Sequence, residues 1–193
     1  MRVFGLILIL ALFSLSAFAQ SESVTKPHKN YFMIDGSGSM KEKHSLLEAT
    51  VERRLEQTRQ NDSNSVIIPT IVGATGREEC AAPISIESPL DDEGSIVIPN
   101  ENYKQSTPLG AALLAAILDA GDDQATILLF SDEGQTDGCG IDVCAVARYH
   151  LPRDNIDVRS VAVGASPEDH DRVGCIEGAQ ASSKTHDVRT GRS

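Results

Sequence analysis

Three oxygen-bearing side chains follow an apolar run near the start of the chain. Asp35, Ser37 and Ser39 alternate with glycines directly after the apolar segment 31–34. Because glycine lacks a Cβ, the backbone can curl here and bring the three side chains to one centre. Carboxylate and hydroxyl oxygens suit magnesium, which prefers an octahedral array of oxygens. The segment therefore predicts a hard-cation site, or else a turn in which the aspartate bonds its own backbone.

Strand-like and helix-like patterns alternate after this segment, which predicts an α/β fold with a doubly wound, mostly parallel sheet and helices on both faces. The β-prone segments 84–87 and 95–98 predict one antiparallel edge strand. Pro69 conflicts with an inner position for its strand, because proline removes a ladder hydrogen bond. We expect strands at 31–34, 66–72, 125–130, 156–163 and 185–188, and helices at 42–60, 107–120, 142–151 and 167–182.

Further polar candidates follow other elements of the predicted sheet. In open α/β sheets the ligand crevice lies beyond the carboxyl ends of the strands. Asp132 follows the strand at 125–130, and Thr107 stands at a helix start that must return to the same rim. The alternative is that Thr107 only caps its helix and Asp132 only begins a loop. We expect oxygens from three segments to meet at one edge of the sheet.

These three segments together resemble von Willebrand factor type A domains. The segment 35–40, DGSGSM, matches the D-x-S-x-S motif, 106–109 resembles the threonine loop, and 131–132 falls where the second aspartate falls. The resemblance runs over about 30–188. It is greatest to exported bacterial members that have cysteines after the second aspartate and in the last helix.

The resemblance implies a metal-ion-dependent adhesion site. Ser37, Ser39 and Thr107 would hold a divalent cation, directly or through water, while Asp35 and Asp132 bind those waters and hydroxyls. The cation is usually magnesium, with manganese and calcium as alternatives. Two carboxylates and neutral hydroxyls leave the ion short of negative charge, so an Asp or Glu carboxylate from a protein or peptide partner would complete the coordination.

Two features depart from the family pattern. Glu133 stands where the family usually has glycine, and this extra carboxylate would either strengthen the cation site or take the place of the partner. The sequence ends at Ser193, soon after the last expected strand. We therefore expect the C-terminal helix that shifts on ligand binding in some family members to be missing.

The first residues predict export. Arg2 precedes the apolar run 3–13, and the segment 17–19 supplies an A-x-A cleavage site. This run is shorter than the about 20 residues that span a bilayer, so 1–19 is interpreted as a cleaved signal peptide. A flexible lead at 20–29 and one domain at 30–193 follow. The mature protein is expected to be secreted or periplasmic, with no membrane span.

The net charge and the cysteines restrict the possible partners and metal sites. The formal net charge of −11 at pH 7 argues against nucleic acid as a partner, because nucleic acid is bound mainly through lysine and arginine. The four cysteines predict two disulfides in an oxidising compartment. Either Cys139 pairs with Cys144 and Cys80 with Cys175, or Cys80 pairs with Cys139 and Cys144 with Cys175. A zinc site is the rival interpretation, although no C-x-x-C pair occurs.

Three functions fit these observations to different degrees. A binding module that grips a carboxylate through a metal ion accounts for the candidate ligands and the acidic composition. A metal-dependent hydrolase of phosphate esters would use Asp35 as nucleophile, but Ser37 stands where phosphotransfer needs a second acid. Neither a G-x-S-x-G elbow nor an H-E-x-x-H motif occurs. The third alternative is a structural interaction domain with an empty metal site.

Overall fold

The structure is a computed structural model that describes residues 26–73, 90–98, 104, 106–132, 141–151, 153–164 and 174–176. The expected signal peptide at 1–19, Cys80, Cys139, Glu133 and the expected strand at 185–188 lie outside these residues. None of the helices within them is long and apolar enough to cross a membrane.

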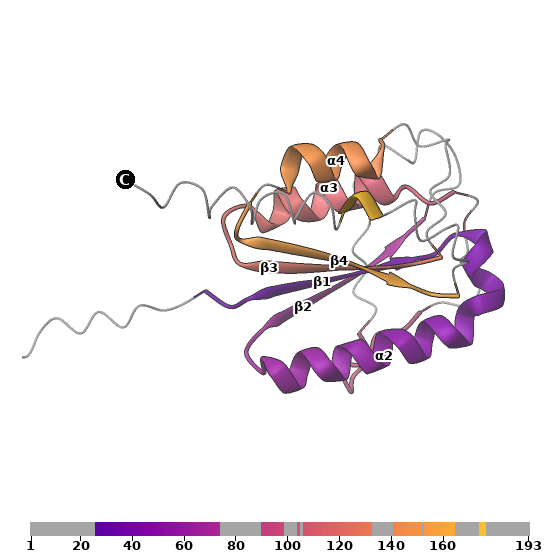
Figure 1. Ribbon diagram of the computed structural model, residues 1–193. Helices are drawn as coiled ribbons and strands as arrows, with labels where there is room; N and C mark the ends of the chain where they lie inside the picture. The colour runs from indigo at the N-terminus through magenta and orange to yellow at the C-terminus, as the bar shows by residue number, and fades with distance from the viewer. Residues whose placement is uncertain are drawn as a thin grey trace, which may run out of the picture.

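Four parallel strands form the sheet, in the order β2-β1-β3-β4 (Figure 1). Lys29 lies opposite both Val66 and Ala125, so neighbouring strands begin at one level and their carboxyl ends meet at one rim. The α/β class with a parallel sheet is therefore confirmed. The strands are β1 (Lys29–Asp35), β2 (Val66–Val72), β3 (Ala125–Ser131) and β4 (Ile156–Ala162).

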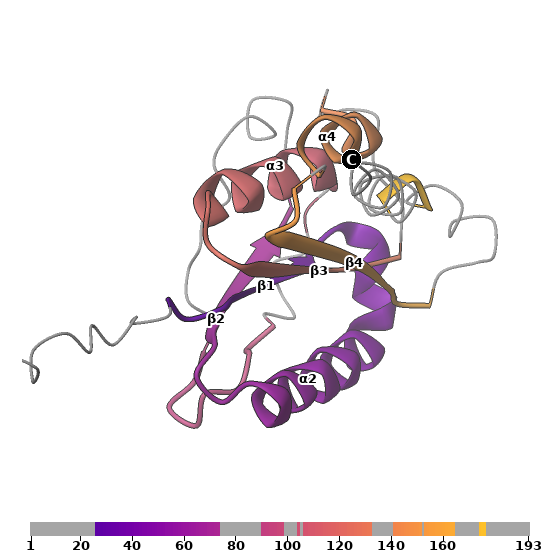
Figure 2. The same ribbon diagram turned by 60° about the vertical axis from the view of Figure 1, so that its left-hand side comes forward.

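Helices cover both faces of the sheet. The helix α2 (His44–Asn61) lies on one face, and α3 (Leu109–Ala120) and α4 (Val143–His150) lie on the other (Figures 1 and 2). A 3-10 helix, η1 (Gly38–Lys43), leads from the end of β1 into α2. The predicted helix at 42–60 thus begins in this tighter turn rather than as an α-helix.

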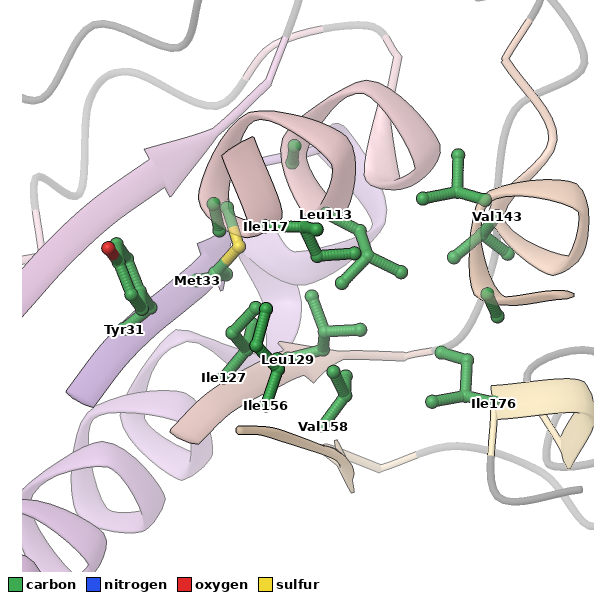
Figure 3. Packing of buried hydrophobic residues seen from close by; sticks show 14 of the residues in the cluster. Tyr31, Met33, Leu113, Ile117, Ile127, Leu129, Val143, Ile156, Val158 and Ile176 are labelled. Atoms are coloured by element: carbon green, nitrogen blue, oxygen red, sulfur yellow. The ribbon is translucent and has the colours of Figure 1, made fainter. Parts of the chain in front are cut away.

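Each face of the sheet has its own apolar core. Alternate residues of β1 point to opposite faces, so Tyr31 and Met33 pack in the cluster under α3 and α4 (Figure 3). Phe32 packs in the cluster under α2, where its ring stacks on that of Phe130 with centroids 5.5 Å apart. Burial on both faces explains why β1 and β3 are apolar almost throughout, as is typical of parallel sheets.

Pro69 lies in β2, which is outermost among the described strands. Among the described strands, β2 pairs only with β1. The amide of Val66 donates to the carbonyl of His28, and alternate amides of a strand point the same way, so the nitrogen of Pro69 faces away from β1. Proline is tolerated at such a position, and the conflict foreseen in the sequence disappears.

The predicted antiparallel edge strand is not present in the described part of the chain. Leu90 and Ile96 form only an isolated antiparallel bridge, and 84–87 lies outside the described residues. Lys29, which was predicted to belong to the flexible lead at 20–29, is the first residue of β1.

A disulfide joins Cys144 in α4 to Cys175, with an S–S distance of 2.01 Å. The pairing of Cys139 with Cys144 and Cys80 with Cys175 is therefore wrong, and the Cys144–Cys175 bond of the alternative is confirmed. The reason is spatial, because both half-cystines pack against the core cluster under α3 and α4. The bond also uses two of the thiols that a zinc site would need.

Candidate metal centre

The carboxylate of Asp35 lies fully buried at the carboxyl end of β1. Its Oδ1 accepts a hydrogen bond of 2.8 Å from the backbone amide of Ser37. Its Oδ2 accepts one of 2.6 Å from the hydroxyl of Ser131 at the end of β3. Ile34 pairs with Phe130 in the parallel register, so the next residues along, Asp35 and Ser131, meet at the rim.

The loop after Asp35 is pressed against the end of β2. The amide of Gly36 donates to the carbonyl of Val72 at 2.7 Å, and a Cβ on Gly36 would lie only 2.8 Å from Cγ2 of Ile71. Glycine is thus required here by close approach. Beyond it, the hydroxyls of Ser37 and Ser39 lie 3.0 Å apart, with Ser37 buried and Ser39 exposed.

The segment that precedes Thr107 is bound to the same loop. The amide of Lys104 donates to the carbonyl of Gly36 at 2.7 Å, and Lys104 forms a parallel bridge with Ser37. Thr107 follows three positions later and is buried. Its predicted role as helix cap is wrong, because Pro108 holds the N-cap position of α3 and its carbonyl accepts from the amide of Ala112.

The carboxylate of Asp132 lies directly after β3 and is almost completely buried. Its Oδ2 accepts a hydrogen bond of 2.9 Å from Nζ of Lys43. Its Oδ1 is buried, and no hydrogen-bond donor among the described residues reaches it. Leaving a buried polar atom unpaired costs about 1–3 kcal/mol, and a bound cation would satisfy this oxygen. The donor chemistry here therefore fits a hard divalent ion.

The pKa of Asp35 also supports a cation site. Burial raises the pKa of Asp35 to about 6, against the lowering effect of its hydrogen bonds from Ser131 and Ser37, and the negative charge of Asp132 raises it further. The neighbouring carboxylate of Asp132 thus disfavours the ionised form of Asp35. A divalent cation bound beside Asp35 would favour its ionised form.

The donors would be two carboxylates and several hydroxyls. Within the described ranges, no three His, Cys, Asp or Glu side chains gather at one point. The accessory acid candidate, Glu133, lies outside those ranges.

Two residues of this site were not among the predicted ligands. Ser131 was seen only as the neighbour of the second aspartate, and the strand register would have been the signal for its bond to Asp35. Lys43 had no signal in the sequence, because its contact with Asp132 depends on the path of η1.

Comparison of the chain with models of known protein families found no match, and a search of curated proteins found none either. The likeness to von Willebrand factor type A domains therefore depends on the three sequence segments described above.

Proposed function

We propose that the protein is an exported, metal-dependent protein-binding module of the von Willebrand factor A type. Magnesium is the expected ion, with manganese or calcium as alternatives. The observation that carries the proposal is the buried Oδ1 of Asp132, which no donor in the described part of the chain reaches, at the rim where Asp35 is also buried. Such an arrangement leaves negative charge that a divalent cation would compensate.

The roles of the other residues follow from their positions. Ser37, Ser39 and Thr107 would supply hydroxyl ligands, directly or through water. Ser39 is exposed, which supports an open side of the proposed site toward solvent. A partner's Asp or Glu side chain would reach the ion from that side and form a charge-assisted contact.

The first test is binding of the metal itself. In a thermal denaturation experiment, magnesium or manganese should raise the melting temperature of the mature protein above its value in EDTA, because a ligand that binds only the folded state stabilises it. Asp35→Ala should abolish the rise, while the exposed Asp154→Ala should retain it. An unchanged melting temperature of the wild type would contradict the proposal and favour the structural alternative.

The second test concerns the partner. Immobilised protein should capture an envelope protein or peptide in the presence of manganese and release it in EDTA. Ser39→Ala should lose capture, whereas Ser45→Ala, which removes an exposed hydroxyl from α2, should keep it. Capture that is equal with and without metal would refute the metal-dependent mechanism.

No observation favours the hydrolase alternative. A nucleophilic aspartate must reach its substrate, but Asp35 is fully buried and both of its carboxylate oxygens accept hydrogen bonds. We therefore do not propose a catalytic role for it.

A further inference from the structure

The ammonium group of Lys43 lies inside the proposed metal site. Its Nζ is 2.9 Å from Oδ2 of Asp132, and the two side chains are only 30% and 9% exposed. The ion pair connects the end of η1 to the end of β3, across 89 positions of sequence. A partly buried pair of this kind is much less screened by solvent than a surface pair.

The stem of Lys43 reaches Asp132 past the exit of β4. Gly164, which has a positive φ of 62°, follows that strand. A Cβ on Gly164 would lie 3.3 Å from Cδ of Lys43 and 3.5 Å from Cδ2 of Leu46. The lysine stem thus lies close to Gly164, two residues after the end of β4, while its ammonium group contacts Asp132 after β3.

We infer that Lys43 is the internal counter-ion of the metal-free site and that a divalent cation displaces its ammonium group from Asp132. This inference depends on the proposed function, because it concerns the same site. Asp132 lies next to a second buried carboxylate, Asp35. When no metal is present, the ammonium group of Lys43 supplies a positive charge that balances the carboxylate of Asp132.

The exchange follows from charge. An ammonium group in contact with Asp132 and a divalent ion bound at the same carboxylate would repel each other at short range. Binding of the metal at Oδ1 of Asp132 therefore weakens the contact of Lys43 with Oδ2 and favours withdrawal of the ammonium group. The cost of that withdrawal lowers the apparent affinity of the site for metal, because a ligand is weakened by the competing contact it must break.

The matched pair of variants is Lys43→Met and Lys41→Met. Both remove one positive charge from η1, but Lys41 is exposed and only Lys43 contacts Asp132. Titration calorimetry with manganese chloride should show that Lys43→Met binds the ion roughly 5- to 100-fold more tightly than the wild type, from the loss of one short-range repulsion. Lys41→Met should stay within about twofold, because exposed charges are screened.

A second readout does not depend on affinity. Lysine acylation followed by mass spectrometry should label Lys43 slowly in EDTA and faster when the wild type is saturated with manganese. Lys41 should be labelled at the same rate in both conditions. This measurement needs no variant, so it decides the question even if Lys43→Met fails to fold.

The outcomes separate the two proposals. If the wild type binds manganese and Lys43→Met binds it equally or more weakly, or if labelling of Lys43 is unchanged at saturation, the counter-ion inference is overturned and the metal site stands. If neither protein binds manganese, the proposed function fails and the inference fails with it.

Discussion

Replacing Asp35 by asparagine should stabilise the metal-free protein at neutral pH, although Asp35 is a central residue of the proposed site. Asparagine has nearly the same shape. Its amide oxygen can accept from the amide of Ser37, and its NH2 group can donate to the hydroxyl of Ser131, which then rotates. The substitution removes the buried charge and keeps the contacts.

The magnitude comes from the pKa of Asp35. Its pKa is about 6 in the folded state, against 3.8 for an aspartate in water. Each pKa unit corresponds to about 1.4 kcal/mol. Below about pH 4, Asp35 is protonated in the folded and the unfolded state, and the wild type keeps its full free energy of unfolding. As the pH rises through about 6, the raised pKa of Asp35 lowers the free energy of unfolding by about 3 kcal/mol in total. Asparagine does not ionise, so its advantage over the wild type should grow over the same interval.

The assay is urea denaturation in EDTA from pH 4 to pH 8, comparing wild type, Asp35→Asn and Asp154→Asn. The difference in unfolding free energy between Asp35→Asn and wild type should rise with pH toward about 3 kcal/mol, while the exposed Asp154→Asn should show little change. With magnesium present the order should reverse, since only the wild type gains stability from the ion. A difference that does not vary with pH would refute the reasoning about burial and charge.

Two further predictions concern the scaffold of the site. Replacing both Cys144 and Cys175 by alanine should lower the unfolding free energy by about 3–4 kcal/mol, the cross-link entropy for their sequence separation of 31; a loss below about 1 kcal/mol would contradict it. Gly36→Ala should cost about 1–3 kcal/mol by overpacking, because its Cβ would lie 2.8 Å from Ile71, whereas Gly38→Ala, with its nearest contact at 3.4 Å, should be almost neutral. Equal effects of the two glycine substitutions in chemical denaturation would argue against close approach as the reason for Gly36.

The fold could be predicted from the sequence largely because β1 and β3 are buried on both faces and are therefore short, continuous apolar runs. The predicted strand at 66–72 also matches β2 in both bounds. The start of α3 was less predictable, since Thr107 and Pro108 can each precede a helix and only the backbone path decides which one caps it.

The site residues that follow directly after strands could be predicted from the sequence. The hydrogen bonds between side chains of different strands could not. Asp35 and Asp132 follow apolar strands, so their meeting at one rim follows from parallel topology. The bond from Ser131 to Asp35 needs the strand register, which composition does not give. Cysteine spacing left two disulfide pairings open, because the choice depends on how α4 packs.

Pro69 affects whether a strand of a second copy of the protein can pair with β2. An outermost strand offers amides and carbonyls to which a strand of a second chain can add, and this is a common route to fibrous aggregates. In the middle of β2 the outward amide is replaced by a proline ring, so an incoming strand would find no donor there. Among the described strands β2 is outermost, and Pro69 removes one of the donors to which a strand of a second copy could add.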